Sequence, residues 1–302
     1  MSSVFNSTIT VISVSKDRFH TNANSLLWDC KTKWLKGDKD IQSYIYDVFC
    51  DESAVGNPCG VVILDEWLTD SELLALTNEL AQPVTSFVVE NAQGYWIRWF
   101  SLSCEINLCG HGSLGAGAAI AEHFGRQLVI LQSQYGNVVI SKQNEFYQIA
   151  LPSWDAKLSE LDITPFGLNH SVKDQFTTRD LVIVLDSEEA VRHFEPDFGR
   201  LMQIEDYHAF IVTAQSGPTE YVLRYFAPKI GIPEDLATGS AQCSLAPYWF
   251  DKLKSNSLSV RQLSSSGGYF QVDKCVTDSI LVSAYVKQRI GAVICSENFA
   301  VL

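Results

Sequence analysis

Short apolar stretches separated by turn residues recur along the chain from about residue 43 onward. They cover 44–49, 60–64, 86–89, 95–100, 128–131 and 138–141, and then 181–185, 209–213, 221–226, 268–272 and 280–286. Runs of this length, bounded by turn-forming residues, are typical of strands. Tyr135, Gly136 and Asn137 separate two of the runs and predict a hairpin, because Gly and Asn tolerate a positive φ. The pattern predicts a protein dominated by β-sheet.

Helical patterns are fewer. Thr69 and Glu72 form the sequence signature of a capping box, and three leucines follow at helical spacing before Pro83. Two further helices open on a Gly-Ser pair: Gly112–Ser113 precedes a helix over 114–124, and Gly239–Ser240 precedes one over 241–253. Small residues let a helix sit tightly inside a wrapped sheet, so each half of the chain is expected to be a curved sheet around one central helix.

The spacing of these two starts suggests a chain built from two similar halves. Ser113 and Ser240 lie 127 positions apart, close to half of the chain that follows residue 42. Residues 1–42 show no sustained period and are interpreted as an N-terminal extension. The first half is expected over 43–152, with 288–302 able to complete it, and the second half over 153–287.

Composition and charge narrow the function. The chain has 302 residues, 46% of them hydrophobic, and a formal net charge of −13. It can therefore fill large cores, and its charge disfavours nucleic acid and anionic membranes as partners. No run reaches the roughly 20 apolar residues of a membrane span, and the first 18 residues lack a secretory signal pattern, which favours the cytoplasm. The 8 cysteines show neither C-x-x-C pairs nor zinc spacing, so reduced thiols and no metal site are expected.

The two helix starts are candidates for binding an anion. A helix start carries unsatisfied N–H groups and the positive end of the helix dipole, so two facing starts can hold a carboxylate. Gly110, Gly112 and Gly239 would let a ligand approach the backbone, and the hydroxyls of Ser113 and Ser240 could add hydrogen bonds. The alternative is that Gly-Ser is ordinary helix-start chemistry.

Two titratable residues accompany these starts. His111 lies between two glycines, where an imidazole is expected to be exposed and to titrate near neutral pH, as a proton-transfer group must. Asp235 precedes the second helix and could cap it, hold His111 in one tautomer, or exchange a proton. Both are candidate catalytic residues.

Taken together, these motifs resemble a known family. Residues 56–58 (Gly-Asn-Pro), 108–111 (Leu-Cys-Gly-His) and 234–241 (Glu-Asp-Leu-Ala-Thr-Gly-Ser-Ala) match the PhzF-like family of phenazine biosynthesis in order and approximate spacing. A weaker fourth match is Gln-Leu-Ser at 262–264, before the Gly-Gly pair at 267–268. The resemblance covers residues 43–302.

The resemblance implies an α+β fold like that of diaminopimelate epimerase. Such a fold has two pseudo-equivalent halves, each a rolled, mostly antiparallel sheet around a central helix, with the site between them. The best-known member isomerises a dihydroxyanthranilate derivative without any cofactor, and members are commonly homodimers. By motif, His111, Asp235 and Ser240 match three active-site residues of the family, and Asn57 joins the substrate-binding candidates.

Three positions depart from the family pattern. Val84 stands where the family carries its principal acid/base glutamate, and a valine cannot carry a proton. Cys109 is similar to one of the two cysteines that epimerases of this fold use, but the partner position holds Leu236-Ala237, which argues against a two-thiol racemase. Ser266 stands where many relatives carry Arg.

These features lead to two hypotheses of different classes. The first is a biosynthetic, cofactor-independent isomerase or cyclase for a small carboxylate-bearing metabolite, in which His111 and Asp235 move protons and Val84 lines an apolar wall. A ring closure or pericyclic rearrangement needs a shaped pocket more than a strong base. The second is a non-catalytic small-molecule-binding protein. The chain lacks G-x-G-x-x-G and G-x-x-x-x-G-K-[ST], so a nucleotide-dependent enzyme is not supported.

Overall fold

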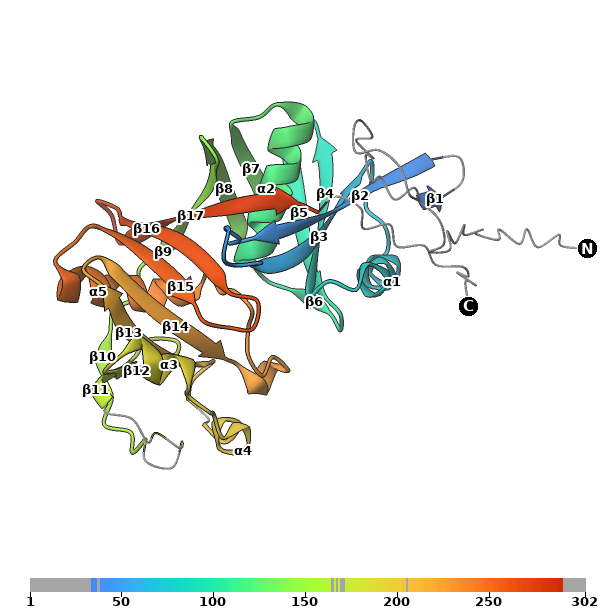
Figure 1. Cartoon of the computed structure of the whole chain (residues 1–302). Helices are drawn as coiled ribbons and strands as arrows, with labels where there is room; N and C mark the ends of the chain where they lie inside the picture. Colours follow the sequence, from blue (N-terminus) through green and yellow to red (C-terminus); the bar gives the residue numbers. More distant parts are fainter. Residues whose placement is uncertain are drawn as a thin grey trace, which may run out of the picture.

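The computed structural model describes residues 34–36, 39–163, 166, 168, 172–204 and 206–289 (Figure 1). The amino-terminal part contains β1 (Trp34–Lys36), β2 (Lys39–Val48), β3 (Asn57–Leu64), α1 (Asp70–Leu80), β4 (Val84–Asn91), β5 (Gly94–Ser101), β6 (Glu105–Ile106), α2 (Gly110–Phe124), β7 (Leu128–Ser133), β8 (Gly136–Gln143) and β9 (Phe146–Pro152). The remainder contains β10 (Lys157–Leu158), β11 (Val172–Thr177), β12 (Leu181–Leu185), α3 (Glu188–Arg192), α4 (Phe198–Leu201), β13 (Phe210–Gly217), β14 (Glu220–Phe226), the 3₁₀ helix η2 (Pro228–Ile230), α5 (Ala241–Leu253), β15 (Ser257–Gln262), β16 (Gly268–Lys274) and β17 (Ser279–Gln288).

The two halves repeat one pattern of strand pairing. From β2 through β5, β7, β8 and β9, successive pairs are antiparallel, parallel, antiparallel, parallel, antiparallel and antiparallel. From β11 to β17 the same six pair types follow in the same order. Each parallel pair needs a crossover, which α1 and α2 supply in the first half and α3, α4 and α5 in the second. The predicted α+β fold with two pseudo-equivalent halves is confirmed.

Strand β17 belongs to both halves. It pairs with β16 in the second half, and it also pairs with β9 and β2, which closes the first sheet into a barrel. The first half is therefore completed by 279–288, a segment that the sequence pattern had assigned almost entirely to the second half. Residues 290–302, expected to be able to complete the first half, lie outside the described residues. So do residues 1–33 of the expected extension, while β2 begins at Lys39, inside that extension.

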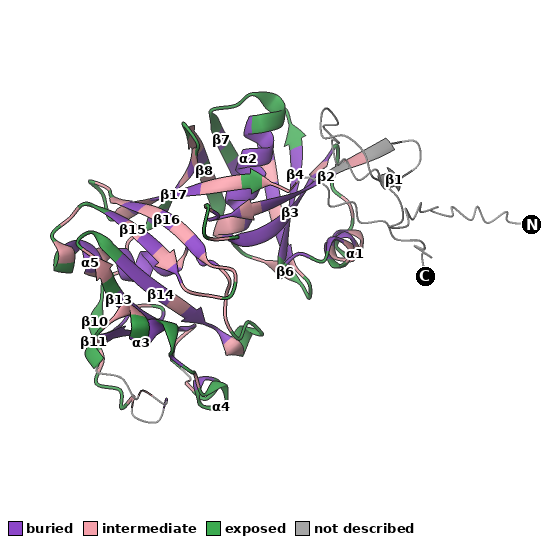
Figure 2. Cartoon of the chain, in the orientation of Figure 1, coloured by how far each residue is buried: buried purple, intermediate pink, exposed green. Residues whose placement is uncertain are grey.

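Each half wraps around its helix. Helix α2 buries a continuous stretch from Gly112 to Ala121 inside the first barrel, where an added Cβ at Gly115 would lie 2.3 Å from the Cys59 sulfur and one at Gly117 would lie 2.6 Å from Ile140. Helix α5 packs against β15, β16 and β17. Figure 2 shows α2 largely buried within its sheet, and the buried residues of α5 run from Ala241 to Ala246 and include Trp249 and Phe250. The small residues of α2 therefore allow the close fit that the sequence predicted.

The cores of the two halves meet beside the helix starts. One continuous cluster of buried side chains includes Leu114 on α2 and Leu245 on α5. Phe49, from the loop after β2, is fully buried at this junction, where its ring lies 4.3 Å from that of Phe270 and also contacts Gly239. The two halves are thus packed together at the level of the candidate site.

Local sequence signals agree with the structure at several places. Helix α1 has the predicted capping box, in which Thr69 and Glu72 exchange hydrogen bonds between side chain and backbone. The predicted hairpin joins β7 and β8, and Gly136 has a φ of +117°. Strands β9, β11 and β15 and helices α3 and α4 were not predicted. In the described part of the chain, no helix combines the length and apolar character needed to cross a membrane.

Candidate active site

Cys109 is the N-cap residue of helix α2 and caps it through its sulfur. The Cys109 Sγ accepts a hydrogen bond from the Gly112 N–H at 3.3 Å, and the Cys109 carbonyl accepts from the N–H of Ser113 at 2.9 Å. The same sulfur lies 3.3 Å from Nδ1 of His111 and 3.9 Å from Nε2. Cysteine is not among the usual capping residues, so this helix start places a thiol where a hydroxyl or carboxylate is commonly found.

The imidazole of His111 is partly buried against this thiol. Burial lowers the pKa of His111 to about 4, because the charged imidazolium loses hydration there. The expectation that His111 is exposed and titrates near neutral pH is therefore wrong. At neutral pH the ring is uncharged, so one of its nitrogens carries a hydrogen and the other can accept one.

The thiol of Cys109 is protonated in this environment. Burial above all, together with the charge of Asp235, raises its pKa to about 12, although hydrogen bonds from the backbone of Gly112 and His111 oppose the shift. Two conclusions follow. Cys109 is not a ready thiolate, and the carboxylate of Asp235 lies near enough to the start of α2 to act on it.

Asp235 is held by side chains of both halves. Its Oδ1 accepts a hydrogen bond from Nδ2 of Asn57 at 2.9 Å, and its Oδ2 accepts from the Thr238 hydroxyl at 2.6 Å. Burial raises the pKa of Asp235, and the hydrogen bonds from Thr238 and Asn57 oppose this shift. Among the described residues, Asp235 makes no hydrogen bond that would cap α5 and none to His111. Its predicted roles of capping the helix and orienting the imidazole therefore find no support.

Gln262 fixes the loop that carries Asp235. Its Oε1 accepts from the Thr238 N–H at 2.8 Å, and its Nε2 donates to the Asp235 carbonyl at 2.7 Å. The Ser264 hydroxyl donates to the Leu236 carbonyl at 2.5 Å. Gln262 was not among the predicted site residues. It is the first residue of the weaker fourth motif, which was the sequence feature that could have identified it.

Strand β3 connects the two candidate catalytic residues. Asn57, at its first position, binds Asp235, and Cys59, two residues later on the same strand, directs its thiol toward the His111 carbonyl at 3.8 Å. Together with the effect of Asp235 on Cys109, these contacts place the two helix starts next to each other. That His111, Asp235 and Ser240 border one cavity stays a prediction.

The glycines and serines predicted to bind substrate differ in what they touch. Gly110 has open space where a side chain would be, whereas Gly112 and Gly239 are packed against Ser86 and Phe49 respectively. The Ser113 hydroxyl is fully buried and donates to the Cys109 carbonyl at 2.7 Å. It therefore supports the helix start and does not face a ligand.

The corresponding serine of the second half is different. Ser240 is the N-cap residue of α5, is partly exposed, and makes no capping hydrogen bond through its side chain. Its hydroxyl is therefore not engaged in capping the helix. Gly110 and Ser240 are thus the predicted binding residues that are neither packed against a neighbour nor used to cap a helix.

Val84 lies in the barrel wall beside the same helix start. It is the first residue of β4, is 7% exposed, and pairs with Cys59 across the parallel β3–β4 ladder. Since Cys59 contacts His111, Val84 is close to the position at which an acid/base group could serve the site. The Val84 side chain belongs to the main cluster of buried hydrophobic residues.

A cavity of about 270 Å³ adjoins this region. It shares Gln262 with the loop that carries Asp235, and it lies between the loop after β2 and the segment that joins β15 to β16. Arg192 and Arg261 line it, and both pair with Glu188 at 2.6 and 2.8 Å. Among the described residues, no group of three or more His, Cys, Asp or Glu side chains is placed to hold a metal ion.

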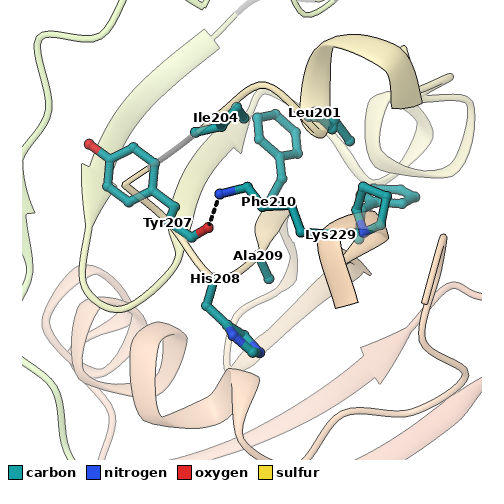
Figure 3. A pocket seen from close by; sticks show the side chains of 9 residues that line it. Leu201, Ile204, Tyr207, His208, Ala209, Phe210 and Lys229 are labelled. Carbon is teal, nitrogen blue, oxygen red and sulfur yellow. Dashed lines mark hydrogen bonds between the residues drawn. The ribbon is translucent and has the colours of Figure 1, made fainter. Parts of the chain in front are cut away.

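A second cavity lies in the second half, away from these residues. It has a volume of about 10 Å³, room for roughly one water molecule. Figure 3 shows it between Leu201, Ile204 and Phe210, with the ammonium of Lys229 donating to the carbonyl of Tyr207 at 2.8 Å. A cavity of this size cannot accept a metabolite, so it does not compete with the helix starts as a substrate site.

Two rolled sheets, each around a central helix and joined beside the helix starts, define the fold of diaminopimelate epimerase-like proteins. The model of the family described as phenazine biosynthesis-like protein (PhzC-PhzF) matches residues 46–273, and the chain belongs to this family.

Individual relatives agree with this assignment. An "uncharacterized isomerase" of Vibrio cholerae is 57% identical over 82% of this chain and 89% of its own length. Another, of Pseudomonas aeruginosa, is 35% identical over 74% of this chain and 86% of its own. A crystal structure of a PhzC/PhzF protein from Clostridium difficile has a TM-score of 0.77 at 31% identity and covers 83% of this chain and 98% of that one. The relatives support an isomerase-type enzyme.

Proposed function

We propose that this protein is a cofactor-independent isomerase or cyclase that acts on a small, carboxylate-bearing metabolite between its two halves. Asp235 and His111 are the groups that handle protons in this proposal. The observation that carries it is the hydrogen bond between Asn57 and Asp235, because it fixes a buried carboxylate of one half beside the helix start of the other.

The protonation of the two groups suits this role. Asp235 has a raised pKa, which makes its carboxylate a stronger base than an exposed one, and it is held in place by two hydrogen bonds. His111 is uncharged at neutral pH and can offer a ring N–H or a ring lone pair. A fixed carboxylate can remove a proton from one atom of the substrate, and a neutral imidazole can donate or accept a hydrogen bond at another atom.

The open groups of the helix starts favour an anionic ligand. Helix α2 has 15 residues and α5 has 13, so each presents a full helix dipole at its amino end. The Ser240 hydroxyl and the backbone at Gly110 are the groups free to contact a carboxylate. The negative net charge of the protein is thus compatible with a local preference for anions.

The reaction type that we propose depends on Val84. The family route relies on a glutamate at this position, and losing a positioned acid/base group typically costs roughly 10²- to 10⁴-fold in rate. We therefore propose altered chemistry in which the apolar wall around Val84 shapes a conjugated or apolar part of the substrate. Ring closure and pericyclic rearrangement are the reaction types that depend least on a strong base.

The test is exchange and conversion in deuterated water. Purified full-length protein is incubated in D₂O with a metabolite extract of its source organism, beside His111→Asn and a matched control, His208→Asn, and products are followed by mass spectrometry. We expect label uptake or a new product with the natural and His208 forms and its loss with the His111 form. A compound that binds without any His111-dependent change would instead favour the non-catalytic binding protein, which the burial of Val84 also permits.

A further inference from the structure

We infer that Arg179 binds the carboxylate of the substrate. The inference rests on the proposed function and deepens it, because it assigns a residue to the acidic group of the ligand. The chain has a net charge of −13, so a group that attracts an anion has to act locally. Arg179 is a cation of the second half whose guanidinium is fixed on one edge and has a nitrogen left for a ligand.

A buried carboxylate holds one edge of the Arg179 guanidinium. Asp180 is fully buried, and its two oxygens accept from Nε at 3.1 Å and from Nη2 at 3.2 Å. The hydroxyl of Ser244, on α5, also donates to Asp180 Oδ2 at 3.2 Å. A two-point pair of this kind fixes the plane of the guanidinium, so the rest of the group keeps one orientation.

The other contacts of Arg179 leave one nitrogen unengaged. Its Nη2 donates to the Tyr225 hydroxyl at 3.1 Å, and the guanidinium carbon lies 4.7 Å from the centre of the Trp154 ring. Its Nη1 makes no hydrogen bond to any residue that the structure describes, and 37% of the side chain is exposed. The two hydrogens of Nη1 can therefore be donated to a ligand.

Arg224 is a useful comparison, because its guanidinium is used within the fold. Its Nε and Nη2 pair with Glu234 at 2.7 and 2.9 Å, through the same edge that Arg179 offers to Asp180. Its Nη1, however, donates to the Phe194 carbonyl at 2.6 Å, and only 14% of the side chain is exposed. A structural ion pair in this protein thus has a partner for Nη1, and the pair made by Arg179 has none among the described residues.

Arg179 lies at the end of the second sheet from which the Asp235 loop leaves. It precedes β12, whose first residue pairs with Phe210, and Phe210 pairs with the last residue of β14. One residue before that end, the Tyr225 carbonyl accepts from the Asp235 N–H at 3.0 Å. The repeated pairing pattern makes β12 the counterpart of β3, whose first residue, Asn57, contacts Asp235. The corresponding ends of both sheets therefore lie beside the Asp235 loop.

Electrostatic effects connect Arg179 to the same region. Burial raises the pKa of Tyr225, as do the charges of Asp180 and Asp235, whereas Arg179 opposes the shift. Burial above all raises the pKa of Cys243, in the first turn of α5, to about 12, and Arg179 opposes this shift as well. Arg179 thus acts on the start of α5 and on the phenol that Asp235 also influences. A substrate whose carboxylate lies on Arg179 can place its reacting atoms toward Asp235.

The NMR signal of Arg179 tests ligand contact directly. In full-length ¹⁵N-labelled protein at about pH 6 and constant ionic strength, the Nε–H signal missing from Arg179→Lys identifies Arg179. Sodium benzoate, a simple conjugated carboxylate, is the probe, and benzamide, which has the same shape without the charge, is its control. We expect a saturable shift of the Arg179 signal with benzoate, no shift with benzamide, and an unchanged Arg224 signal with both. No saturable shift, or equal shifts with both probes, would overturn the inference.

Paired variants separate the loss of the cation from damage to the fold. Arg179→Gln alone leaves the buried Asp180 carboxylate without its partner, so the double variant Arg179→Gln with Asp180→Asn is compared with Asp180→Asn. From the single to the double variant, the dissociation constant for benzoate should rise about 10-fold or more. Arg200→Gln, which removes an exposed arginine of α4, is the charge-matched control and should leave the affinity unchanged. Equal affinities of the single and double variants would contradict the inference.

The inference and the proposed function can fail separately. If the protein converts a metabolite, the double variant should have a KM about 10-fold above that of Asp180→Asn and a kcat within about 3-fold, because a contact to a non-reacting carboxylate stabilises ground state and transition state alike. Turnover that depends on His111, with a KM that does not respond to Arg179, would leave the proposed function standing and remove the inference. Benzoate binding that depends on Arg179, without any His111-dependent reaction, would do the reverse.

Discussion

Asn57 donates a hydrogen bond to the carboxylate of Asp235 at 2.9 Å, although the two residues are 178 positions apart and lie in different halves of the protein. The same Asn57 amide donates to the Ala237 carbonyl at 3.0 Å. One side chain at the start of β3 therefore fixes the loop before α5. Because this loop carries Asp235, the geometry of the candidate site depends on a contact between the halves.

Removing this contact should destabilise the protein. Asn57→Ala deletes two hydrogen bonds, one of them to a carboxylate, and leaves both acceptors buried without their donor. We expect a loss of about 2–3 kcal/mol in the free energy of unfolding, measured by denaturant titration. Asn137→Ala, which changes an exposed asparagine in the β7–β8 hairpin, is the control and should lie within about 0.5 kcal/mol of the natural protein. Equal effects of the two substitutions would contradict the structural role of Asn57.

The low pKa of His111 makes stability depend on pH. Between about pH 6.5 and about pH 4 the unfolded chain binds a proton at His111 that the folded protein does not, so folding stability falls as the pH falls through this range. The natural protein should lose about 1–3 kcal/mol over this interval relative to His111→Asn. Above pH 6.5 the two curves of unfolding free energy should run parallel. Curves parallel over the whole range would show that His111 titrates normally.

The fit of α2 inside the first barrel can be tested with a pair of glycines on that helix. Alanine usually stabilises a helix relative to glycine by roughly 1 kcal/mol, but at Gly117 its methyl group would lie 2.6 Å from Ile140. Gly117→Ala should therefore destabilise the protein by about 1–3 kcal/mol. Gly110→Ala, where nothing lies within 4 Å of the added carbon, should leave thermal stability unchanged or raised. The opposite order of melting temperatures would exclude the close packing described.

A glutamate placed at Val84 should be held neutral by its surroundings. Position 84 is 7% exposed, so burial would raise the pKa of the new carboxyl above its unfolded value. The stability of Val84→Glu relative to Val84→Gln should then fall as the pH rises, by about 2–4 kcal/mol between pH 4 and pH 8, because the unfolded chain ionises freely. Thermal denaturation at several pH values measures this difference. A difference that does not change with pH would place position 84 in contact with solvent.

Local sequence patterns were sufficient for the elements whose signals are local. The α1 capping box, the small-residue start of α2 and the exact span of α5 could be read from consecutive residues. Strands β11 and β15 could not, because four of the six residues in each are polar, and β15 alternates buried Leu258, Val260 and Gln262 with partly or fully exposed positions. The repeat of pairing types between the halves was likewise visible only in the folded chain.

As with the helices and strands, only part of the candidate site could be predicted from the sequence. The motifs pointed to His111 and Asp235, and residues of β3 contact both of them. That the two residues act in one site stays a prediction. The pKa of His111 was predicted wrongly, because flanking glycines suggest exposure, whereas the surrounding fold partly buries the ring against Cys109. The fourth motif marked Gln262, but its role could not be inferred from it, since that role depends on hydrogen bonds to a loop 24 to 27 positions earlier in the chain.

Strand β17 has a consequence for the order in which the molecule can be assembled during synthesis. Its pairing with both β2 and β9 means that the amino-terminal barrel stays open until residue 288 has left the ribosome. The edges of β2 and β9 are meanwhile unpaired templates, and such edges promote association with other chains. From the synthesis of β9 until that of β17, the first half therefore lacks its closing strand, and the growing polypeptide is most vulnerable to aggregation in that interval.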